Sequence, residues 1–508
     1  MPAKLNRNED KVRGVLSCYD RVLVQGNLPG LGYAKGMTSY LYERGIRIFD
    51  YKQKFAQPLR DRIRENAREL AKQAGVPIVD ARALKGMRKE KWVAQQLEKR
   101  GYAPGLVCIL WALERCTEYK PWHDRNQGKT FLQSKRGKCL HYYFYFIDEQ
   151  FGLCFMRVPT WCPFRLQFYF NGHNWLAAQM TEAGIGYQML DNVFVSIDDF
   201  DAAQSLADGL SYPLLHKTLN HYAQRFCPVL DELGVDYRWT LMQVEYSTDV
   251  VFRRQEDLAA LYEHLVRTAV HTVKAENVAT FLGRKLHGNY QDEVGNDLGR
   301  RVVGTRIKHS MGPASIKMYD KRGLVLRIET TCNDVSFFKH YRTVYHRNGE
   351  RSSKVAPMLK TLCNLPVDLR DVMRTCNHRY LEFVLALETP TADTKALDKV
   401  TGSVKRGGRS YRGFNFFLQQ DRSLFEVLLR GEFNLSGLRN RDLRRFLPGL
   451  SPGQVSHRIK RLRVHGLLKK VANRYRYHLT SFGKRVLATA LRLRKCVILP
   501  ALVSATTE

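Results

Sequence analysis

The chain has 508 residues, and its 82 Lys and Arg against 49 Asp and Glu give a formal net charge of +33. One hydrophobic core does not grow to this length, so we expect several domains. A hydrophobic content of 44% excludes a disordered chain, and no apolar run reaches the length that spans a bilayer. The excess positive charge predicts salt-dependent binding to a polyanion, for which nucleic acid is the first candidate, and we expect no membrane partner.

The eleven cysteines are scattered, and no two of them have the C-x-x-C spacing of a zinc site. Their odd number fits reduced thiols in the cytosol. The first residues, MPAKLNRNEDKVRG, are polar and lack the apolar segment of a signal peptide. We therefore expect a cytoplasmic protein.

Strands and helices alternate along the first part of the chain, which predicts an α/β or α+β domain over residues 1–235. Residues 12–28 are predicted to form two strands around a turn at Asp20-Arg21. The stretch 120–138 is polar and basic and has no periodicity, so it is predicted to be a loop.

The most aromatic part of the chain is the run 141–146, followed by 152–158 and 165–170. One interpretation is a sheet face on which bases stack, with Arg157 and Arg165 on the phosphates. The other is the core of a sheet. Because consecutive strand residues point to opposite faces, at least half of these aromatics should be buried, which favours the core.

A second α+β domain is predicted over residues 236–388, beginning with the long strand 238–252. Within it, the charged stretch 340–354 is predicted to be a loop. Residues 389–420 are rich in Thr, Lys, Gly and Ser and are predicted to be a linker. The remaining segment, 421–496, is predicted to be a third domain, which makes the chain an α+β multidomain protein with mixed sheets in its first two domains.

Residues 315–329 predict two strands around a turn at Arg322-Gly323. With a two-residue loop, one face of this hairpin carries Ile316, Met318, Asp320, Val325, Arg327 and Glu329. The other face then carries Lys317, Tyr319, Lys321, Leu324, Leu326 and Ile328.

Carboxylates on the strands of a basic protein suggest a Mg²⁺ site for phosphodiester chemistry, because Mg²⁺ prefers a few hard oxygen ligands and leaves room for phosphates. Asp249, Asp320 and Glu329 are the candidate catalytic and metal-binding residues of a nuclease or strand-transferase. A basic residue, Lys308, His309 or His287, is expected nearby. The alternative is an ion-pair network of Asp320, Arg327 and Glu329 on a solvated sheet face.

The segment IKMYDKRGLVLRIE also resembles the Tyr-Asp-Lys and Arg-Ile-Glu strands of phage and plasmid rolling-circle replication initiators. That resemblance implies that Tyr319 attacks a DNA phosphate and forms a covalent phosphotyrosine. The chain departs from the pattern because it has no His-hydrophobic-His triplet to hold the metal. In the two-residue-loop register Tyr319 lies on the more apolar face, which favours a core tyrosine.

The C-terminal segment predicts a basic helix that begins at Ser451-Pro452, a good N-cap followed by a proline in the first helical position. Val455, Ile459 and Leu462 form its apolar stripe, and Gly466 ends it. Upstream, a helix capped by Asn440 and one opened by a Ser423–Glu426 capping box are predicted. Downstream we expect strands over 467–471 and 475–479, and a helix over 481–493.

Between Ser451 and Cys496 there is no Asp or Glu, which is typical of a phosphate-facing surface. The segment from about Leu424 to Leu493 resembles the winged helix-turn-helix of MarR-like transcriptional regulators. The resemblance and the basic face together give the candidate nucleic-acid-binding residues: Gln454, Ser456, His457, Arg458, Lys460, Arg461 and Arg463 on the helix, and Arg474 and Arg476 in the wing. A winged helix that contacts protein is the alternative.

The segments FGLCFMRVPTWCPFRLQFYFNGHNWL and RIKHSMGPASIKMYDK are similar to those of a family of large bacterial proteins of uncharacterised activity, which implies no reaction. We therefore predict a DNA-binding protein. The first alternative is a nicking, strand-transfer or replication-initiating enzyme of a mobile element, with Mg²⁺ as its cofactor. The second is an RNA-binding component of a ribonucleoprotein. A homodimer is compatible with all three.

Overall fold

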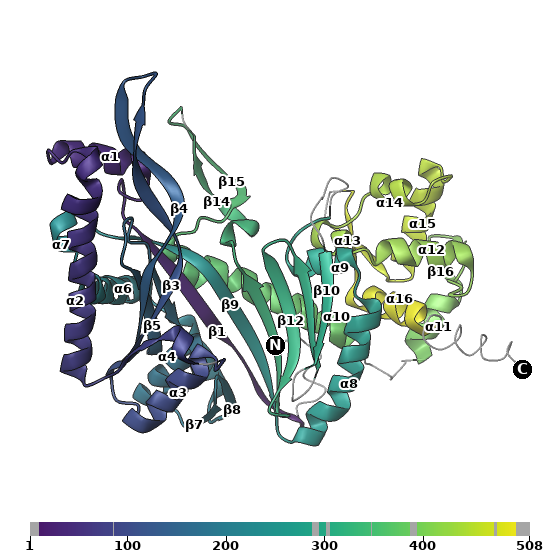
Figure 1. Ribbon diagram of the computed structural model, residues 1–508. Helices are drawn as coiled ribbons and strands as arrows, with labels where there is room; N and C mark the ends of the chain where they lie inside the picture. The colour runs from purple at the N-terminus through teal and green to yellow at the C-terminus, as the bar shows by residue number, and fades with distance from the viewer. Residues whose placement is uncertain are drawn as a thin grey trace, which may run out of the picture. The chain divides into compact units, whose positions relative to one another are not determined.

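The computed structural model describes residues 10–84, 86–286, 294–300, 305–346, 348–386, 394–471 and 475–493 (Figure 1). Helices and strands are mixed along the chain, so the predicted α+β class is confirmed. The main sheet contains β1 (Val12–Asn27), β2 (Ile78–Asp80), β3 (Gly105–Asp124), β4 (Lys129–Asp148), β5 (Gly152–Pro159), β6 (Leu166–Phe170), β9 (Arg238–Phe252), β10 (Val294–Arg300), β11 (Thr305–Met311), β12 (Ala314–Lys321) and β13 (Val325–Cys332).

These eleven strands form one sheet in the order β10-β11-β12-β13-β9-β1-β6-β5-β4-β3-β2. The β2–β3 pair is parallel, whereas β3–β4, β4–β5, β5–β6 and β1–β6 are antiparallel, so the sheet is mixed. The sequence predicts separate sheets in two domains. Strand partners that are hundreds of residues apart cannot be read from local periodicity, which is why this prediction is wrong.

The chain divides into two compact units. The N-terminal unit is Leu16–Ser247 with Thr331–Asp371, and the C-terminal unit is Met1–Val15 with Thr248–Thr330 and Val372–Glu508. Their boundaries fall inside strands β1, β9 and β13 and inside a helix, rather than in linkers. The units are therefore not the consecutive segments 1–235, 236–388 and 421–496 that the sequence predicts.

The N-terminal unit contains a long hairpin, β3–β4, in which the two strands pair without interruption from Cys108–Tyr145 to Asp124–Lys129. The predicted loop over 120–138 is therefore wrong, because both of its sides continue as strands. Residues 12–27 also form one continuous strand, β1, without the predicted turn at Asp20.

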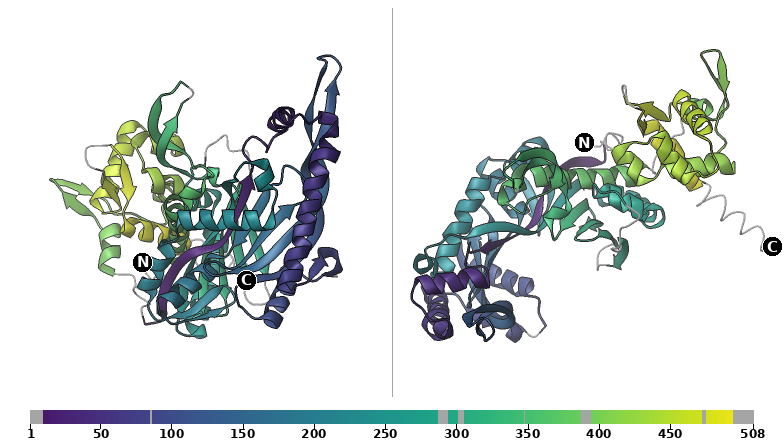
Figure 2. Two further views of the ribbon diagram at one scale, coloured as in Figure 1. Left: turned by 90° about the vertical axis from the view of Figure 1, so that its left-hand side faces the viewer. Right: turned by 90° about the horizontal axis from the view of Figure 1, so that it is seen from above.

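A second hairpin of this unit, β14 (Lys339–Tyr345) with β15 (Arg351–Pro357), replaces the predicted charged loop over 340–354. Figures 1 and 2 show that the β3–β4 and β14–β15 hairpins project from the N-terminal unit in the same direction. The remaining elements of the unit are α1 (Ala34–Glu43), α2 (Gln57–Ala74), α3 (Lys89–Arg100), α4 (Gly172–Glu182), β7 (Tyr187–Leu190), β8 (Val193–Ile197), α5 (Phe200–Asp208), α6 (Tyr212–Phe226) and α7 (Leu230–Leu233).

The aromatic strands of the N-terminal unit form its core, as the second interpretation predicts. Phe144, Phe146, Phe168 and Phe170 are each at most 1% exposed. The ring of Phe226, from α6, stacks on that of Phe144 with 4.5 Å between their centroids. Burial of these rings stabilises this part of the sheet.

In the C-terminal unit, α8 (Gln255–Thr272) and α9 (Ala275–Phe281) pack against β11. The strands β12 and β13 are separated by three residues, Arg322, Gly323 and Leu324, of which the first two have positive φ. The two-residue loop assumed from the sequence is therefore wrong. A shift of one residue moves every side chain of one strand to the other face.

The rest of the C-terminal unit is mainly helical: α10 (Arg370–Ala386), α11 (Thr394–Thr401), β16 (Val404–Arg406), β17 (Arg409–Tyr411), α12 (Gln419–Leu428), α13 (Gly431–Ser436), α14 (Asn440–Phe446), α15 (Pro452–Val464), β18 (Leu468–Lys470), β19 (Tyr477–Leu479) and α16 (Ser481–Leu493). Val400 and Phe414 belong to the apolar core of these last helices. The described part of 389–420, which begins at residue 394, is therefore packed structure rather than a linker.

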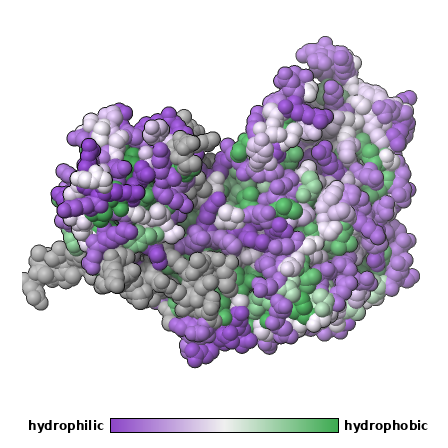
Figure 3. All heavy atoms as spheres, turned by 180° about the vertical axis from the view of Figure 1, so that it is seen from behind, coloured by the Kyte–Doolittle hydropathy of each residue, from purple (hydrophilic) through white to green (hydrophobic). Residues whose placement is uncertain are grey.

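The face of the molecule shown in Figure 3 is mostly hydrophilic, with its exposed apolar side chains in small separate patches. Large contiguous apolar patches are the usual mark of a protein or membrane docking site, and this face has none among its described residues. Among the described helices, none has both the length and the apolar character of a transmembrane segment.

Candidate nucleic-acid interface

The N-terminus of α15 is fixed by the predicted cap. Ser451 Oγ accepts from the backbone N–H of Gln454 at 3.2 Å, and Gln454 Oε1 accepts from the N–H of Ser451 at 2.8 Å. These two bonds form a capping box, which satisfies two backbone donors at once. At the other end, Gly466 has a φ of 75°, as expected of a residue that follows a helix.

The outer face of α15 carries most of the predicted nucleic-acid-binding residues. Its apolar stripe of Val455, Ile459 and Leu462 is buried in the helical core. The side exposed to solvent carries Gln454, Ser456, His457 and Lys460, with Arg458 and Arg463 half-buried at its edges. No described carboxylate pairs with these cations, so the face is positive and open.

Arg461 is the exception among the candidate residues of α15, because it is only 8% exposed. Its guanidinium pairs with both carboxylate oxygens of Asp421, at 2.8 and 3.0 Å, and donates to the carbonyl oxygens of Arg412 and Gly413. It also lies 3.8 Å from the centre of the Phe414 ring. Arg461 therefore anchors the helix and does not reach the outer face, which corrects the sequence-based assignment.

Two upstream predictions also change. The helix α14 starts at Asn440 itself, and Asp442 accepts from the N–H of Arg439 at 2.8 Å. The Asn440 side chain instead donates to the Pro452 carbonyl and to Ser456 Oγ, at 2.9 Å each, and so links α14 to the start of α15. Ser423 does not open a helix, because α12 already begins at Gln419.

The predicted strands after α15 are present but shorter, and β18 and β19 pair antiparallel with Leu468 opposite Leu479. Arg474 lies outside the described residues. Arg476 is half-buried, and its carbonyl oxygen accepts from the N–H of Val471 at 3.0 Å. The predicted helix that follows is confirmed as α16.

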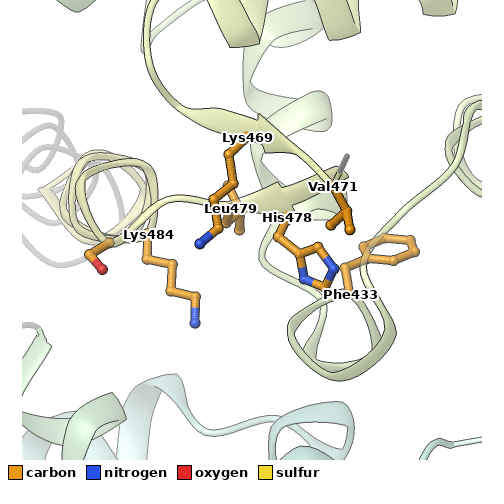
Figure 4. Close-up of a pocket in the computed structure, with 7 residues that line it drawn as sticks. Phe433, Lys469, Val471, His478, Leu479 and Lys484 are labelled. Atoms are coloured by element: carbon orange, nitrogen blue, oxygen red, sulfur yellow. The ribbon is translucent and has the colours of Figure 1, made fainter. Parts of the chain in front are cut away.

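A cavity of about 410 Å³ opens beside this hairpin, lined by Phe433, Lys469, Val471, His478, Leu479, Ser481 and Lys484. Figure 4 shows that the side chains of Lys469 and Lys484 extend into the same open space. Burial lowers the pKa of Lys484, and the neighbouring Lys469 adds to this effect while Glu382 opposes it. Lys469 and Lys484 thus form a second basic surface of the C-terminal segment. It was not predicted, because Lys469 belongs to β18 and Lys484 to α16, and only the fold brings the two side chains together.

The hairpin β12–β13 brings together only some of the predicted catalytic residues. Tyr319 Oη donates to Glu329 Oε2 at 2.5 Å, and Lys317 Nζ lies 2.5 Å from the other oxygen of the same carboxylate. Lys317, Tyr319 and Glu329 therefore share a face, which the assumed register had excluded. Tyr319 is 4% exposed, in agreement with the prediction of a core tyrosine.

The carboxylates of Asp249 and Asp320 form other contacts. Asp249 forms a two-fold ion pair with Arg327, at 2.6 Å for both bonds, and both side chains are buried. Asp320 accepts from the N–H of Gly323 in the hairpin turn, and burial raises the pKa of its carboxyl. Asp249 and Asp320 are therefore engaged in other contacts, and among the described residues they are not grouped with Glu329 as ligands of one cation.

Of the basic residues expected near this hairpin, His287 lies outside the described residues. His309 is buried, and its Nε2 lies 3.1 Å from Tyr380 Oη, so it is a part of the core. Lys308 is half-buried on β11, opposite Lys317 of β12. The predicted ion pair between Asp320 and Arg327 is replaced by the pair with Asp249.

Comparison with protein-family models, with curated proteins and with solved structures found no significant match for this chain. The functional assignment therefore rests on the geometry of these side chains. That geometry favours the open basic face of α15 over the paired and buried charges of the β12–β13 hairpin.

Proposed function

We propose that this protein binds duplex DNA through the exposed face of α15, which acts as the recognition helix of a C-terminal winged helix-turn-helix. The order of elements supports this proposal: α14, a short turn, α15, then the hairpin β18–β19 and α16. The bonds from Asn440 to Pro452 and Ser456 fix α14 against the start of α15. A helix held in this way can enter the major groove as a rigid unit.

The observation that carries the proposal is the charge of the outer face. A solvated helix normally carries both positive and negative side chains. The outer face of α15 carries Arg458, Lys460 and Arg463, and the stretch 451–496 contains no Asp or Glu. Phosphates attract such a surface and release counterions when it binds. Gln454 and His457 add side chains that donate and accept hydrogen bonds, which is what reading base edges requires.

The first experiment is a competition among duplex DNA, single-stranded DNA and structured RNA for the purified protein. We expect the duplex to compete best, and the double variant R458Q/K460Q to lose at least about tenfold in duplex affinity. The matched control is R68Q/K72Q, which removes two exposed charges from α2 in the other unit. Preferential binding of RNA, or equal losses in the two variants, would overturn the proposal.

A second candidate function, cutting of a DNA strand, is favoured by one observation, the contact of Tyr319 and Lys317 with the Glu329 carboxylate. Tyr319 Oη would attack a phosphorus atom and pass its proton to Glu329. The bond from phosphorus to the 3′ oxygen would break, and Lys317 would protonate that oxygen. The products are a 5′-phosphotyrosine and a free 3′ hydroxyl. The burial of Tyr319 ranks this function second, because a strand reaches it only if the hairpin opens.

The test is incubation with labelled DNA, with and without Mg²⁺, followed by a denaturing gel. A covalent protein–DNA product that is lost in Tyr319→Phe but persists in Tyr341→Phe, a tyrosine on the exposed β14–β15 hairpin, would establish the enzyme. If neither cutting nor adduct is seen, the contacts of Tyr319 and Lys317 with Glu329 are structural.

A further inference from the structure

The N-terminal unit contains a cavity of about 340 Å³ on one face of its sheet. Neighbouring strands supply its floor, because Gln25 pairs with Gln167 and Gln167 with Arg157 across β1, β6 and β5. The complete lining is Gln25, Arg115, Cys116, Thr117, Arg136, His141, Arg157, Pro159, Trp161, Pro163, Arg165 and Gln167.

Four arginines are among the residues that line this cavity. Arg157 pairs with Glu114, at 2.7 Å, so its charge is compensated. Arg165 donates to the carbonyl oxygen of Gly32 at 3.0 Å, which orients its head without neutralising it. Among the described residues no carboxylate pairs with Arg115, Arg136 or Arg165. The cavity therefore holds about three uncompensated positive charges, which favours an anion of high charge density.

Two kinds of uncharged side chain in the cavity, an indole and two amides, indicate the chemical class of the ligand. Trp161 lines the cavity and is half-buried, and an aromatic face is a stacking platform for any base. The amides of Gln25 and Gln167 both donate and accept hydrogen bonds, as the edge of a base requires. The volume lies at the lower end of the range for small-molecule sites, which fits one nucleotide and not a folded chain.

We propose that this cavity binds a single nucleotide by its phosphate monoester, with Arg115, Arg136 and Arg165 on the phosphate and Trp161 against the base. A monoester carries about two negative charges at neutral pH and an internal phosphodiester carries about one, so the cluster of arginines selects the monoester. The ligand is a free nucleotide or the phosphorylated 5′ end of a single strand, since both present this chemistry. The site is independent of α15.

The experiment measures binding of two short single-stranded oligonucleotides to the full chain by fluorescence anisotropy. They carry a dye at the 3′ end and differ only in a 5′ phosphate or a 5′ hydroxyl. We expect the phosphorylated strand to bind about tenfold or more tightly, because its 5′ phosphate can accept charge-assisted hydrogen bonds from the arginines. Deoxyadenosine monophosphate as competitor separates the sources: displacement at similar concentration identifies a free nucleotide, and weak displacement identifies a strand end.

The variant R136Q/R165Q should reduce the preference for the 5′ phosphate to less than about twofold, since it removes two of the three uncompensated charges. The control is R68Q, because Arg68 lies on α2 and is not among the residues that line the cavity. The preference should also persist in R458Q/K460Q, so that failure of this site and failure of the DNA-binding proposal are distinguished.

A second readout needs no variant. Cys116 lines the cavity and is partly exposed, and a hydrogen bond from Cys139 lowers the pKa of its thiol. We expect the phosphorylated oligonucleotide or the free nucleotide to slow alkylation of Cys116 at least about fivefold, measured by mass spectrometry, while the exposed Cys363 reacts at an unchanged rate. Equal binding of the two strands, or equal protection by inorganic phosphate alone, overturns the proposal.

Discussion

The outer face of α15 and the charged side of the β12–β13 hairpin contain the same kinds of side chain, but they use them differently. On α15, Lys460 and His457 are exposed, and no carboxylate in the described part of the chain forms an ion pair with either of them. In the hairpin, Arg327 is fully buried against Asp249, and Glu329 is held by Lys317 and Tyr319. Both regions belong to the C-terminal unit.

The difference shows that charge alone does not identify a functional site. A buried charge is stable only when a partner compensates its lost hydration. The buried charged side chains of the hairpin are therefore paired with one another or with Asp249 and are not available to a ligand. An exposed charge without a partner contributes little to folding and remains available to a ligand. Arg461 makes the same point within α15, because it is one residue from Lys460 and yet is paired with Asp421.

The largest effect is expected at the buried pair. Arg327→Ala leaves the Asp249 carboxylate without its ion-pair partner, which should destabilise the C-terminal unit by about 3–5 kcal/mol. Urea unfolding measures this as an earlier transition. Arg327→Lys restores a charge and should recover part of the loss. If Arg327→Ala unfolds no earlier than the exposed Arg441→Ala, the pair does not stabilise the unit.

Substitutions of the adjacent residues Arg461 and Lys460 of α15 should affect different properties, the first stability and the second duplex binding. Arg461→Gln breaks the pair with Asp421 and should cost about 2–4 kcal/mol of stability. Lys460→Gln should change stability by less than about 0.5 kcal/mol but should weaken duplex binding. Thermal unfolding and anisotropy of both variants separate the two roles. A stability loss of similar size in Lys460→Gln would contradict the assignment.

The pH dependence of the free energy of unfolding should reflect the protonation of His309. Burial lowers its pKa in the folded protein from the ordinary 6.5 to about 4. Between these values the unfolded chain binds the proton and the folded chain does not. Stability is therefore complete above pH 6.5 and is lost as the pH falls toward 4, by about 1.4 kcal/mol per pH unit.

His309→Gln removes the titrating group and can still reach Tyr380. The slope of unfolding free energy between pH 6.5 and pH 4.5 should become smaller in this variant. His457→Gln, on the exposed face of α15, is the matched control and should leave the slope unchanged. Equal slopes in wild type and His309→Gln would show that His309 does not contribute to acid unfolding.

The smallest effect concerns the start of α15. Ser451→Ala removes the acceptor for the N–H of Gln454 and should cost about 1 kcal/mol. Thermal unfolding should show a small shift, and Ser451→Thr should restore most of it. A shift in Ser451→Thr as large as that in Ser451→Ala would mean that the hydroxyl is not the stabilising group.

The sequence predicts α15 well because its signals are local. The Ser451 cap, the stripe from Val455 to Leu462 and the terminal Gly466 all act within a few turns of one helix. The sequence does not predict the inward turn of Arg461, because helical spacing places it away from the apolar stripe. It is buried by Phe414, which comes from the segment that the sequence assigns to a linker, and by Asp421, the first residue after that segment.

Long-range pairing is the other part that could not be predicted. A loop of three residues rather than two places Tyr319 and Glu329 on one face, and no local signal distinguished these lengths. The arginine-lined cavity likewise depends on register, which sets Arg136 opposite Thr117 across β3 and β4. Of its four arginines, only Arg157 and Arg165 were singled out from the sequence.

The central claim is that the open cations of α15 contact DNA phosphates. The most direct test is the salt dependence of duplex binding by wild type and by R458Q/K460Q. Each phosphate contact that is lost should reduce the slope of log affinity against log salt by about 0.9, so we predict a decrease of about 2. An unchanged slope in the variant would mean that α15 does not face the DNA.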